Sequence, residues 1–131
     1  YGFVPQTLCE DGERLECFVF STQPNFPGTL VPSKPIAILG AAVGRYVKRL
    51  LVAVPSEEVD PRFEGVKSLR DLPEASVKDV EEFIEVKYGL LPRELLVREL
   101  GDGSAAVSYV LECYNRYVAL SKKEENLVAL R

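Results

Sequence analysis

The chain has 131 residues, of which 47% are hydrophobic and 27% are charged, values that are ordinary for one globular domain with a single core. Its net charge of −4 argues against a general binding surface for nucleic acid, and no nucleic-acid partner is predicted. The absence of histidine excludes histidine-based acid–base catalysis and most zinc sites, and no apolar run is long enough to predict a membrane span.

The first half of the chain favours β-strands. Residues 15–20 are rich in β-forming side chains and follow an Asp-Gly turn. Residues 29–39 are apolar but are interrupted by Pro32 and Pro35, which predicts an edge strand or a bent strand. Residues 50–54 form a continuous apolar run that fits a buried strand.

The second half favours helices. A capping pattern that begins at Ser76 predicts a helix over 76–88 with one apolar face, and residues 94–100 fit one more strand. Asp102 or Ser104 is expected to cap a last helix over 104–120, on which apolar residues recur at helical spacing. Strands followed by helices predict an α+β fold.

The three cysteines, Cys9, Cys17 and Cys113, are an odd number and show no metal-binding spacing. We expect reduced, buried thiols rather than a disulfide framework. Because Cys9 and Cys17 flank one turn, a cross-strand disulfide between them is the alternative.

Several short motifs follow one another in a characteristic order. They are YGFVP at 1–5, the acidic turn DGERLE at 11–16, FPGT at 26–29, KPIAIL at 34–39, LVAVP at 51–55, DPRF at 60–63 and VKSLRDLP at 66–73. Their order and spacing over residues 1–117 resemble those of the family I soluble inorganic pyrophosphatases. The resemblance implies a small, closed, OB-like barrel of five strands flanked by two helices. One domain is then expected over 1–131, with barrel strands in 1–55 and the helices, one strand and the C-terminal tail in 56–131.

The same resemblance concerns the start of the chain. The family has a further segment before its Tyr-Gly-Phe motif, and this chain has no methionine. We therefore expect that the first barrel strands are missing, and that residues precede Tyr1 in the full protein or another polypeptide supplies those strands. Unpaired strand edges recruit other chains, so protein partners are predicted, as a homo-oligomer or a larger complex. The expected location is the cytoplasm or an organelle, mitochondrion or plastid, in soluble or complex-associated form.

The resemblance assigns the acidic turn to magnesium. The family holds the metal with three aspartates, and the corresponding residues here are Asp11, Glu13 and Glu16. We treat these three carboxylates as vestigial metal ligands, and together with Tyr1 as the vestigial catalytic positions. The alternative is a plain hairpin turn at Asp11-Gly12 with solvated glutamates.

A second acidic loop of the family has lost its charges. It aligns without a gap before LVAVP, so that its two aspartates fall on Val43 and Lys48 and its lysine falls on Leu50. An ammonium group at such a position repels a divalent cation. The segment 39–44 is small and apolar, and we expect a turn there that forms a binding surface or simply packs.

Lys48 is expected to replace the charge of the metal. We predict its nitrogen within about 4 Å of a carboxylate of the acidic turn. Side chains alternate along a strand, so Arg49 is expected to point to the opposite face.

The resemblance also suggests three phosphate-binding residues, Lys34, Lys87 and Tyr88. The family pair corresponding to Lys87 and Tyr88 has the reverse order, Tyr-Lys. Adjacent residues on a helix point about 100° apart, so the swap changes the geometry. The alternative is that Lys87 and Tyr88 simply end a helix.

These departures predict a degenerate pyrophosphatase-family domain, inactive or weakly active, that serves as a structural or binding subunit of a larger assembly, with no cofactor. The alternative is an active, magnesium-dependent inorganic pyrophosphatase that hydrolyses diphosphate to two phosphates. A third class is a regulator that binds phosphate or nucleotide anions through Lys34, Lys48, Arg49 and Lys67.

Overall fold

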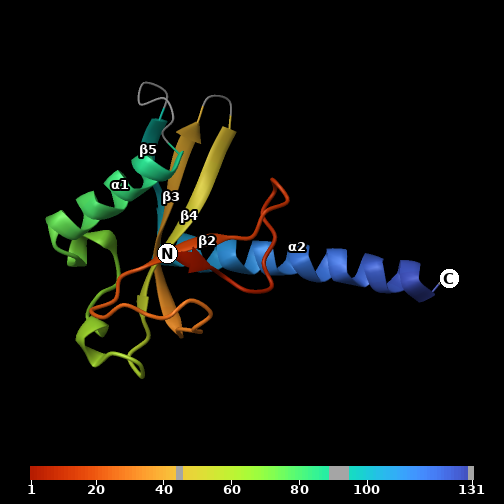
Figure 1. Cartoon of the computed structure of the whole chain (residues 1–131), viewed down its shortest axis with the longest axis horizontal. Coiled ribbons are helices and arrows are strands. Elements are labelled where there is room, and N and C mark those ends of the chain that lie inside the picture. The colour runs from red at the N-terminus through yellow and green to blue at the C-terminus, as the bar shows by residue number, and fades with distance from the viewer. Residues whose placement is uncertain (44–45, 89–94, 130–131) are drawn as a thin grey trace.

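A computed structural model describes residues 1–43, 46–88 and 95–129 of the chain. The strands are β1 Gly2–Phe3, β2 Glu16–Val19, β3 Ser33–Val43, β4 Tyr46–Pro55 and β5 Leu95–Asp102, and the helices are α1 Glu74–Tyr88 and α2 Gly103–Ala129. The five strands form one sheet in the order β1-β2-β4-β3-β5, with the two helices packed outside it (Figure 1). The predicted α+β fold of five strands and two helices is confirmed.

The long antiparallel pair of β3 and β4 forms the centre of the sheet. β5 pairs antiparallel with β3, and β2 pairs parallel with β4. β1 and β5 lie at opposite ends of the strand order, and within the described residues no hydrogen-bonded pairing joins them. The sheet therefore has the expected fold but is not closed into a barrel by hydrogen bonds.

The prediction of an edge strand or a bent strand over 29–39 holds only in part, because residues 33–35 pair with β4 alone, whereas residues 37–43 pair with β4 and β5. The register of β3 with β4 shifts between Pro35 and Ala37, and such an irregularity is one of the few places where a strand tolerates proline. The turn expected over 39–44 was wrong for residues 39–43, which continue β3. Leu39 and Ala41 are buried there, so they offer no binding surface, and Gly44 lies outside the described residues.

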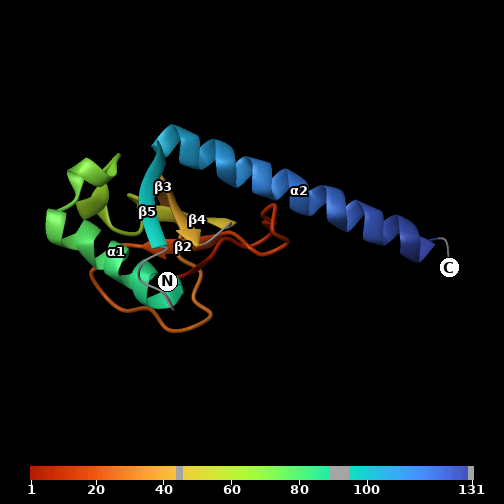
Figure 2. The same ribbon diagram turned by 90° about the horizontal axis from the view of Figure 1, so that it is seen from above.

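The helices begin and end differently from the prediction. α1 begins at Glu74 rather than at Ser76, because the Pro73 carbonyl already accepts hydrogen bonds from the Ser76 and Val77 N–H groups. The predicted Asp102 cap is confirmed, since the N–H of Ala105 donates to Asp102 Oδ1 at 3.1 Å. α2 then continues to Ala129, and Figures 1 and 2 show its C-terminal half extending away from the sheet.

The sheet separates two apolar clusters, because side chains alternate between its faces. The first contains Ile36, Leu39, Leu50, Val52 and Val54 of the sheet with Val80 and Ile84 of α1. The second contains Ile38, Leu51, Ala53 and Cys17 with Ala106 and Cys113 of α2. Figure 2 shows the two helices on different sides of the sheet. Among the described residues, neither helix has both the length and the apolarity that a bilayer span requires.

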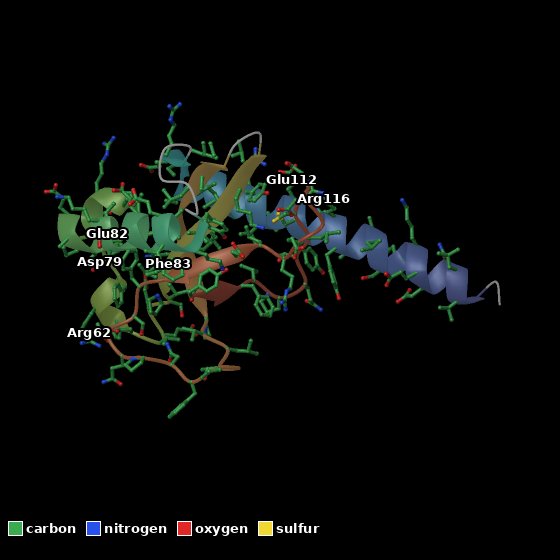
Figure 3. The ribbon with its side chains drawn as sticks, turned by 45° about the horizontal axis from the view of Figure 1, so that its top comes forward. Arg62, Asp79, Glu82, Phe83, Glu112 and Arg116 are labelled. Carbon is green, nitrogen blue, oxygen red and sulfur yellow. The ribbon has the colours of Figure 1, made fainter. Side chains whose placement is uncertain are left out.

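Two contacts fasten the N-terminal loop to α2. The N–H of Leu8 donates to the Cys113 carbonyl at 3.0 Å, and the Arg116 guanidinium donates to the Leu8 carbonyl at 2.8 Å. Glu112 holds Arg116 from one helical turn away, at 3.4 Å, and Figure 3 shows the two side chains together on α2. The loop that precedes the acidic turn is therefore anchored on the α2 side of the sheet.

All three cysteines are buried and free, as predicted. The Sγ atom of Cys9 lies 3.8 Å from that of Cys113, across the contact between the N-terminal loop and α2. The alternative of a disulfide between Cys9 and Cys17 is therefore wrong, and the thiol next to Cys9 is that of Cys113.

Candidate functional site

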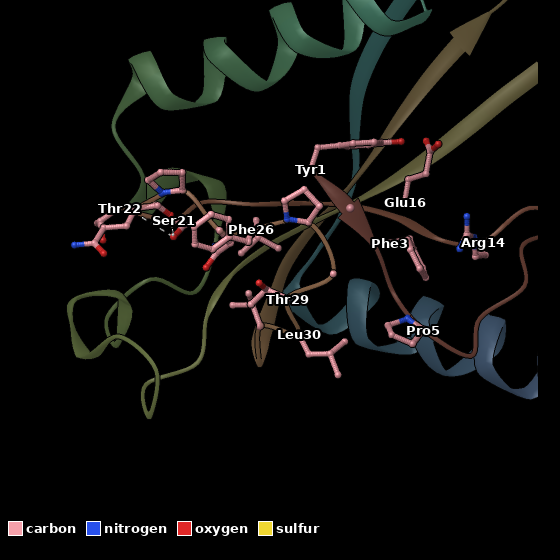
Figure 4. A pocket seen from close by; sticks show the side chains of 18 of the residues that line it. Tyr1, Phe3, Pro5, Arg14, Glu16, Ser21, Thr22, Phe26, Thr29 and Leu30 are labelled. Atoms are coloured by element: carbon pink, nitrogen blue, oxygen red, sulfur yellow. Dashed lines mark hydrogen bonds between the residues drawn. The ribbon is translucent and has the colours of Figure 1, made fainter.

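A cavity of about 1180 Å³ lies beside β1 and the acidic turn (Figure 4). Its polar lining residues include Tyr1, Glu13, Arg14, Glu16, Lys48 and Tyr88. Its opposite wall is the segment 21–31, from which Figure 4 shows Phe26, Thr29 and Leu30. The cavity therefore joins residues from the start of the chain, from β4 and from the end of α1.

The acidic turn is built around Gly12, whose φ of +84° lies in the left-handed region that favours glycine. The N–H of Glu13 donates to Asp11 Oδ1 at 2.9 Å, and the N–H of Cys9 donates to the Glu13 carbonyl at 2.7 Å. Asp11 therefore holds the turn with one oxygen, and its second oxygen remains for another partner.

That partner is Lys48. Its Nζ atom lies 3.0 Å from Asp11 Oδ2, which confirms the predicted contact between Lys48 and the acidic turn. Burial alone would lower the pKa of Lys48, but the hydrogen bond to Asp11 and the charges of Asp11 and Glu16 raise it. Burial would conversely raise the pKa of Asp11, and the N–H of Glu13 together with Lys48 lowers it.

Glu16, on β2, is held by two residues from the end of α1. Lys87 Nζ lies 3.3 Å from Glu16 Oε1, and the Tyr88 hydroxyl donates to the other carboxylate oxygen. Burial raises the pKa of Glu16; the charge of Lys48 opposes this rise, whereas Asp11 adds to it. Lys87 also lies 3.5 Å from the centroid of the Tyr1 ring, so the Tyr1 ring covers the ammonium group that binds Glu16.

Most of the residues expected at the site therefore converge, but Lys34 does not. Tyr1, Glu13, Glu16 and Tyr88 line the cavity. Asp11 and Lys87 do not line it but bind the lining residues Lys48 and Glu16. Lys34 lies apart and donates to the Glu64 carbonyl at 3.4 Å. Sequence analysis identified Lys87 and Tyr88 by resemblance alone. Nothing in the local sequence indicates that they meet a glutamate on β2.

The cations of the proposed anion-binding regulator do not form one site. Arg49 points to the α2 side, where its guanidinium lies 3.0 Å from Glu10 and over the ring of Tyr109. Lys34 and Lys48 have the separate partners described above, and Lys67 is exposed and does not line the cavity. The third functional class therefore has no shared binding surface to support it.

Arg14 was missed as a candidate. It lines the cavity, and its guanidinium carbon lies 3.9 Å from the centroid of the Phe3 ring. The sequence did contain a signal, because Arg14 stands where the resembled family turn, of pattern D-G-D-P-x-D, has its proline. A guanidinium that is held over an aromatic ring is positioned to bind an anion.

The described residues do not fit a resident magnesium ion. Magnesium requires oxygen ligands in near-octahedral geometry. In the described parts of the chain no three acidic, cysteine or histidine side chains converge on a common point. Asp11 and Glu16 instead hold Lys48 and Lys87.

The model of the inorganic pyrophosphatase family matches residues 1–118. The chain belongs to the inorganic pyrophosphatase family. An inorganic pyrophosphatase of Halalkalibacterium halodurans is 34% identical over 117 residues, which cover 89% of this chain and 71% of that protein. An inorganic pyrophosphatase of Geobacillus stearothermophilus is 32% identical, with coverage of 89% and 70%.

The structural comparison agrees with the sequence. The solved inorganic pyrophosphatase of Helicobacter pylori has a TM-score of 0.74 and 25% sequence identity, over 88% of this chain and 68% of that chain. The predicted membership of the soluble family I pyrophosphatases is thus confirmed. The chain spans about two thirds of the length of these pyrophosphatases.

The hypothesis of an inactive structural or binding subunit was wrong. Relatives that are 32% to 34% identical over 117 residues are inorganic pyrophosphatases, which favours the active alternative. That hypothesis rested on the family aspartates that Val43 and Lys48 replace, and these replacements do not outweigh the similarity to such relatives. In the structure Lys48 binds Asp11, and Tyr1, Glu16 and Tyr88 line the cavity beside the acidic turn.

Proposed function

We propose that this chain catalyses the hydrolysis of inorganic diphosphate to two phosphate ions, with magnesium diphosphate as the substrate. The observation that carries the proposal is the polar cavity beside the acidic turn, in a chain of the inorganic pyrophosphatase family. The cavity presents the cations of Arg14 and Lys48, with Lys87 next to Tyr1 and Glu16. Such groups are the usual partners of phosphate oxygens.

Binding of the substrate is assigned to Arg14, Lys87 and Tyr88. Ammonium and guanidinium groups form charge-assisted hydrogen bonds with phosphate oxygens, and a phenol hydroxyl adds a neutral donor. Lys87 and Tyr88 are bound to Glu16 in the structure, so diphosphate would have to draw these donors toward its own oxygens. The magnesium ion enters with the substrate, whose negative charge it partly neutralises.

Glu13 is the best placed proton acceptor. It lines the cavity, and it forms no ion pair within the described residues. A water molecule that attacks one phosphorus atom transfers a proton to the Glu13 carboxylate, and the bond from that phosphorus to the bridging oxygen breaks. The second phosphate leaves with the bridging oxygen.

The proposal is tested by phosphate release from magnesium diphosphate. The purified protein is compared with Tyr88→Phe, which keeps the ring but removes the hydroxyl that binds Glu16. Tyr117→Phe on α2 is the matched control, because Tyr117 does not line the cavity. We expect the wild type and Tyr117→Phe to release phosphate at similar rates and Tyr88→Phe to release it more slowly. A folded wild-type protein that releases no phosphate contradicts the proposal.

Contacts with other protein chains and a cytoplasmic or organellar location stay predictions. Exposed apolar side chains along α2, such as Leu111, Leu127 and Val128, favour a protein partner. Size measurement in solution tests this prediction, because a monomer at all concentrations contradicts a homo-oligomer.

A further inference from the structure

We propose that Lys48 is an internal cation of the acidic turn, where its ammonium group takes the place of a divalent ion at Asp11. The turn then binds free magnesium or manganese only weakly, and the metal of the reaction arrives with the diphosphate. The inference concerns binding in the absence of substrate, so it does not depend on the proposed hydrolysis.

The first support is the occupation of both Asp11 oxygens. Oδ2 binds the Lys48 ammonium at 3.0 Å, and Oδ1 accepts the N–H of Glu13 at 2.9 Å. The Lys48 side chain is 19% exposed and the Asp11 side chain is 46% exposed, so the pair is partly shielded from solvent on the lysine side. A carboxylate oxygen can accept more than one partner, but a metal ion at Asp11 would lie beside the Lys48 ammonium group, which repels it.

The second support is the occupation of Glu16. One of its oxygens binds Lys87 at 3.3 Å, and the other accepts the Tyr88 hydroxyl. The Tyr1 ring lies against the same ammonium group, with its centroid 3.5 Å from Lys87 Nζ. Within the described acidic turn, Glu13 is therefore the carboxylate that is left for a metal, and one carboxylate is a poor ligand set without substrate oxygens.

The third support is the direction of the Lys48 side chain. Because side chains alternate along β4, Lys48 shares a face with Leu50, which packs in the cluster under α1. Arg49 lies on the other face and holds Glu10. The strand therefore directs one cation toward Asp11, and the same alternation supplies an adjacent cation as a control.

The charges of the turn are consistent with this role. Asp11, Glu13 and Glu16 carry three negative charges, and Lys48, Lys87 and Arg14 of the turn itself supply three positive charges. A divalent ion at Asp11 is repelled by the nearby ammonium groups. Removal of the Lys48 charge leaves an excess of negative charge and frees an oxygen of Asp11, so it should strengthen metal binding.

The experiment measures manganese binding to the protein in the absence of diphosphate, by calorimetry and by the electron paramagnetic resonance signal of free manganese. The variants are Lys48→Gln and, as the matched control, Arg49→Gln. We expect Lys48→Gln to bind manganese about tenfold more tightly than the wild type, since one repulsive charge is removed. Arg49→Gln should bind as weakly as the wild type.

Two results overturn the proposal. One is equal manganese affinity of Lys48→Gln and the wild type. The other is a dissociation constant below about 1 mM, the weak end of the range for calcium-binding modules, for manganese at the turn of the wild type. Relaxation of nearby backbone amides would locate the bound manganese at the turn. Manganese binding by the wild type is measured without a variant, so this result tests the proposal even if Lys48→Gln does not fold. Failure of diphosphate hydrolysis alone leaves both binding results intact.

Discussion

Lys48 and Arg49 are neighbours on β4, yet they bind adjacent acidic residues from opposite faces of the sheet. Lys48 Nζ lies 3.0 Å from Asp11, and the Arg49 guanidinium lies 3.0 Å from Glu10. The predicted alternation of the two cations is confirmed. The two ion pairs thus fix the N-terminal turn to the first half of β4.

Replacement of Asp11 with asparagine should lower the stability of the protein at neutral pH. The expected loss in the free energy of unfolding is about 0.5–1 kcal/mol, since the pair with Lys48 is partly exposed. The folded pKa of Asp11 lies below its ordinary value of 3.8, so its stabilisation is present above pH 3.8 and is lost as the pH falls through the folded pKa. The difference between the wild type and Asp11→Asn should therefore shrink below pH 3.8.

Urea unfolding as a function of pH measures this difference. Glu57→Gln is the control, because Glu57 is exposed and lies in another turn. We expect that control to change the free energy of unfolding by less than about 0.5 kcal/mol at every pH. A loss in Asp11→Asn that stays constant down to acidic pH would show that the ion pair is not its cause.

Replacement of Lys87 with methionine should impair hydrolysis of magnesium diphosphate. We expect kcat/KM to fall by about tenfold or more, which corresponds to at least about 1.4 kcal/mol of transition-state stabilisation. Lys78→Met on the same helix is the matched control. The Lys78 side chain is 67% exposed and pairs only with Glu74 at 3.7 Å, so its removal should leave the rate nearly unchanged. Equal effects of the two substitutions contradict the assignment of Lys87 to the substrate.

Truncation of Ile84 should destabilise the fold, because this side chain is fully buried between α1 and the sheet. Ile84→Ala is expected to lower the free energy of unfolding by about 2–4 kcal/mol. Val86→Ala, two residues further on, removes a side chain that is 85% exposed and should cost less than about 0.5 kcal/mol. Similar losses at both positions, measured by thermal or urea unfolding, would mean that α1 does not pack as described.

The native thiols should react slowly with an aromatic disulfide reagent at mildly alkaline pH. Burial raises the pKa of Cys17 to about 12, and burial also dominates the rise of the pKa of Cys9 to about 11. The reactive thiolate is therefore scarce, and Cys113 is buried as well. Three thiols should react rapidly after denaturation. Rapid labelling of one thiol in the native protein contradicts its described burial.

The local sequence predicted most elements correctly. The apolar run at 50–54 lies in β4, and the predicted helix 76–88 lies within α1. Pro35 correctly marked a part of β3 that pairs with β4 alone, but it did not show that β3 becomes a central strand from Ala37 onward, after the register shift. The register is a relation between two strands, and one strand alone does not contain it.

The candidate site depended more strongly on tertiary structure. The acidic turn was evident from its glycine and its spaced carboxylates. The sequence predicted that Lys48 contacts this turn, but not that Lys87 meets Glu16, which lies 71 residues away in the sequence. The hypothesis of an inactive domain followed from the family aspartates that Val43 and Lys48 replace.

The sequence by itself determined the family, the α+β class, a helix cap at Asp102 or Ser104 and the opposite directions of Lys48 and Arg49. These features depend on residue order, on local backbone hydrogen bonds and on the alternation of side chains along a strand. Only the tertiary structure decided that β3 is central from Ala37 onward, that α1 brings Lys87 and Tyr88 to Glu16, and that Asp11 is the carboxylate that binds Lys48. Electrostatic interactions depend on distance in space, which the packing of remote segments determines.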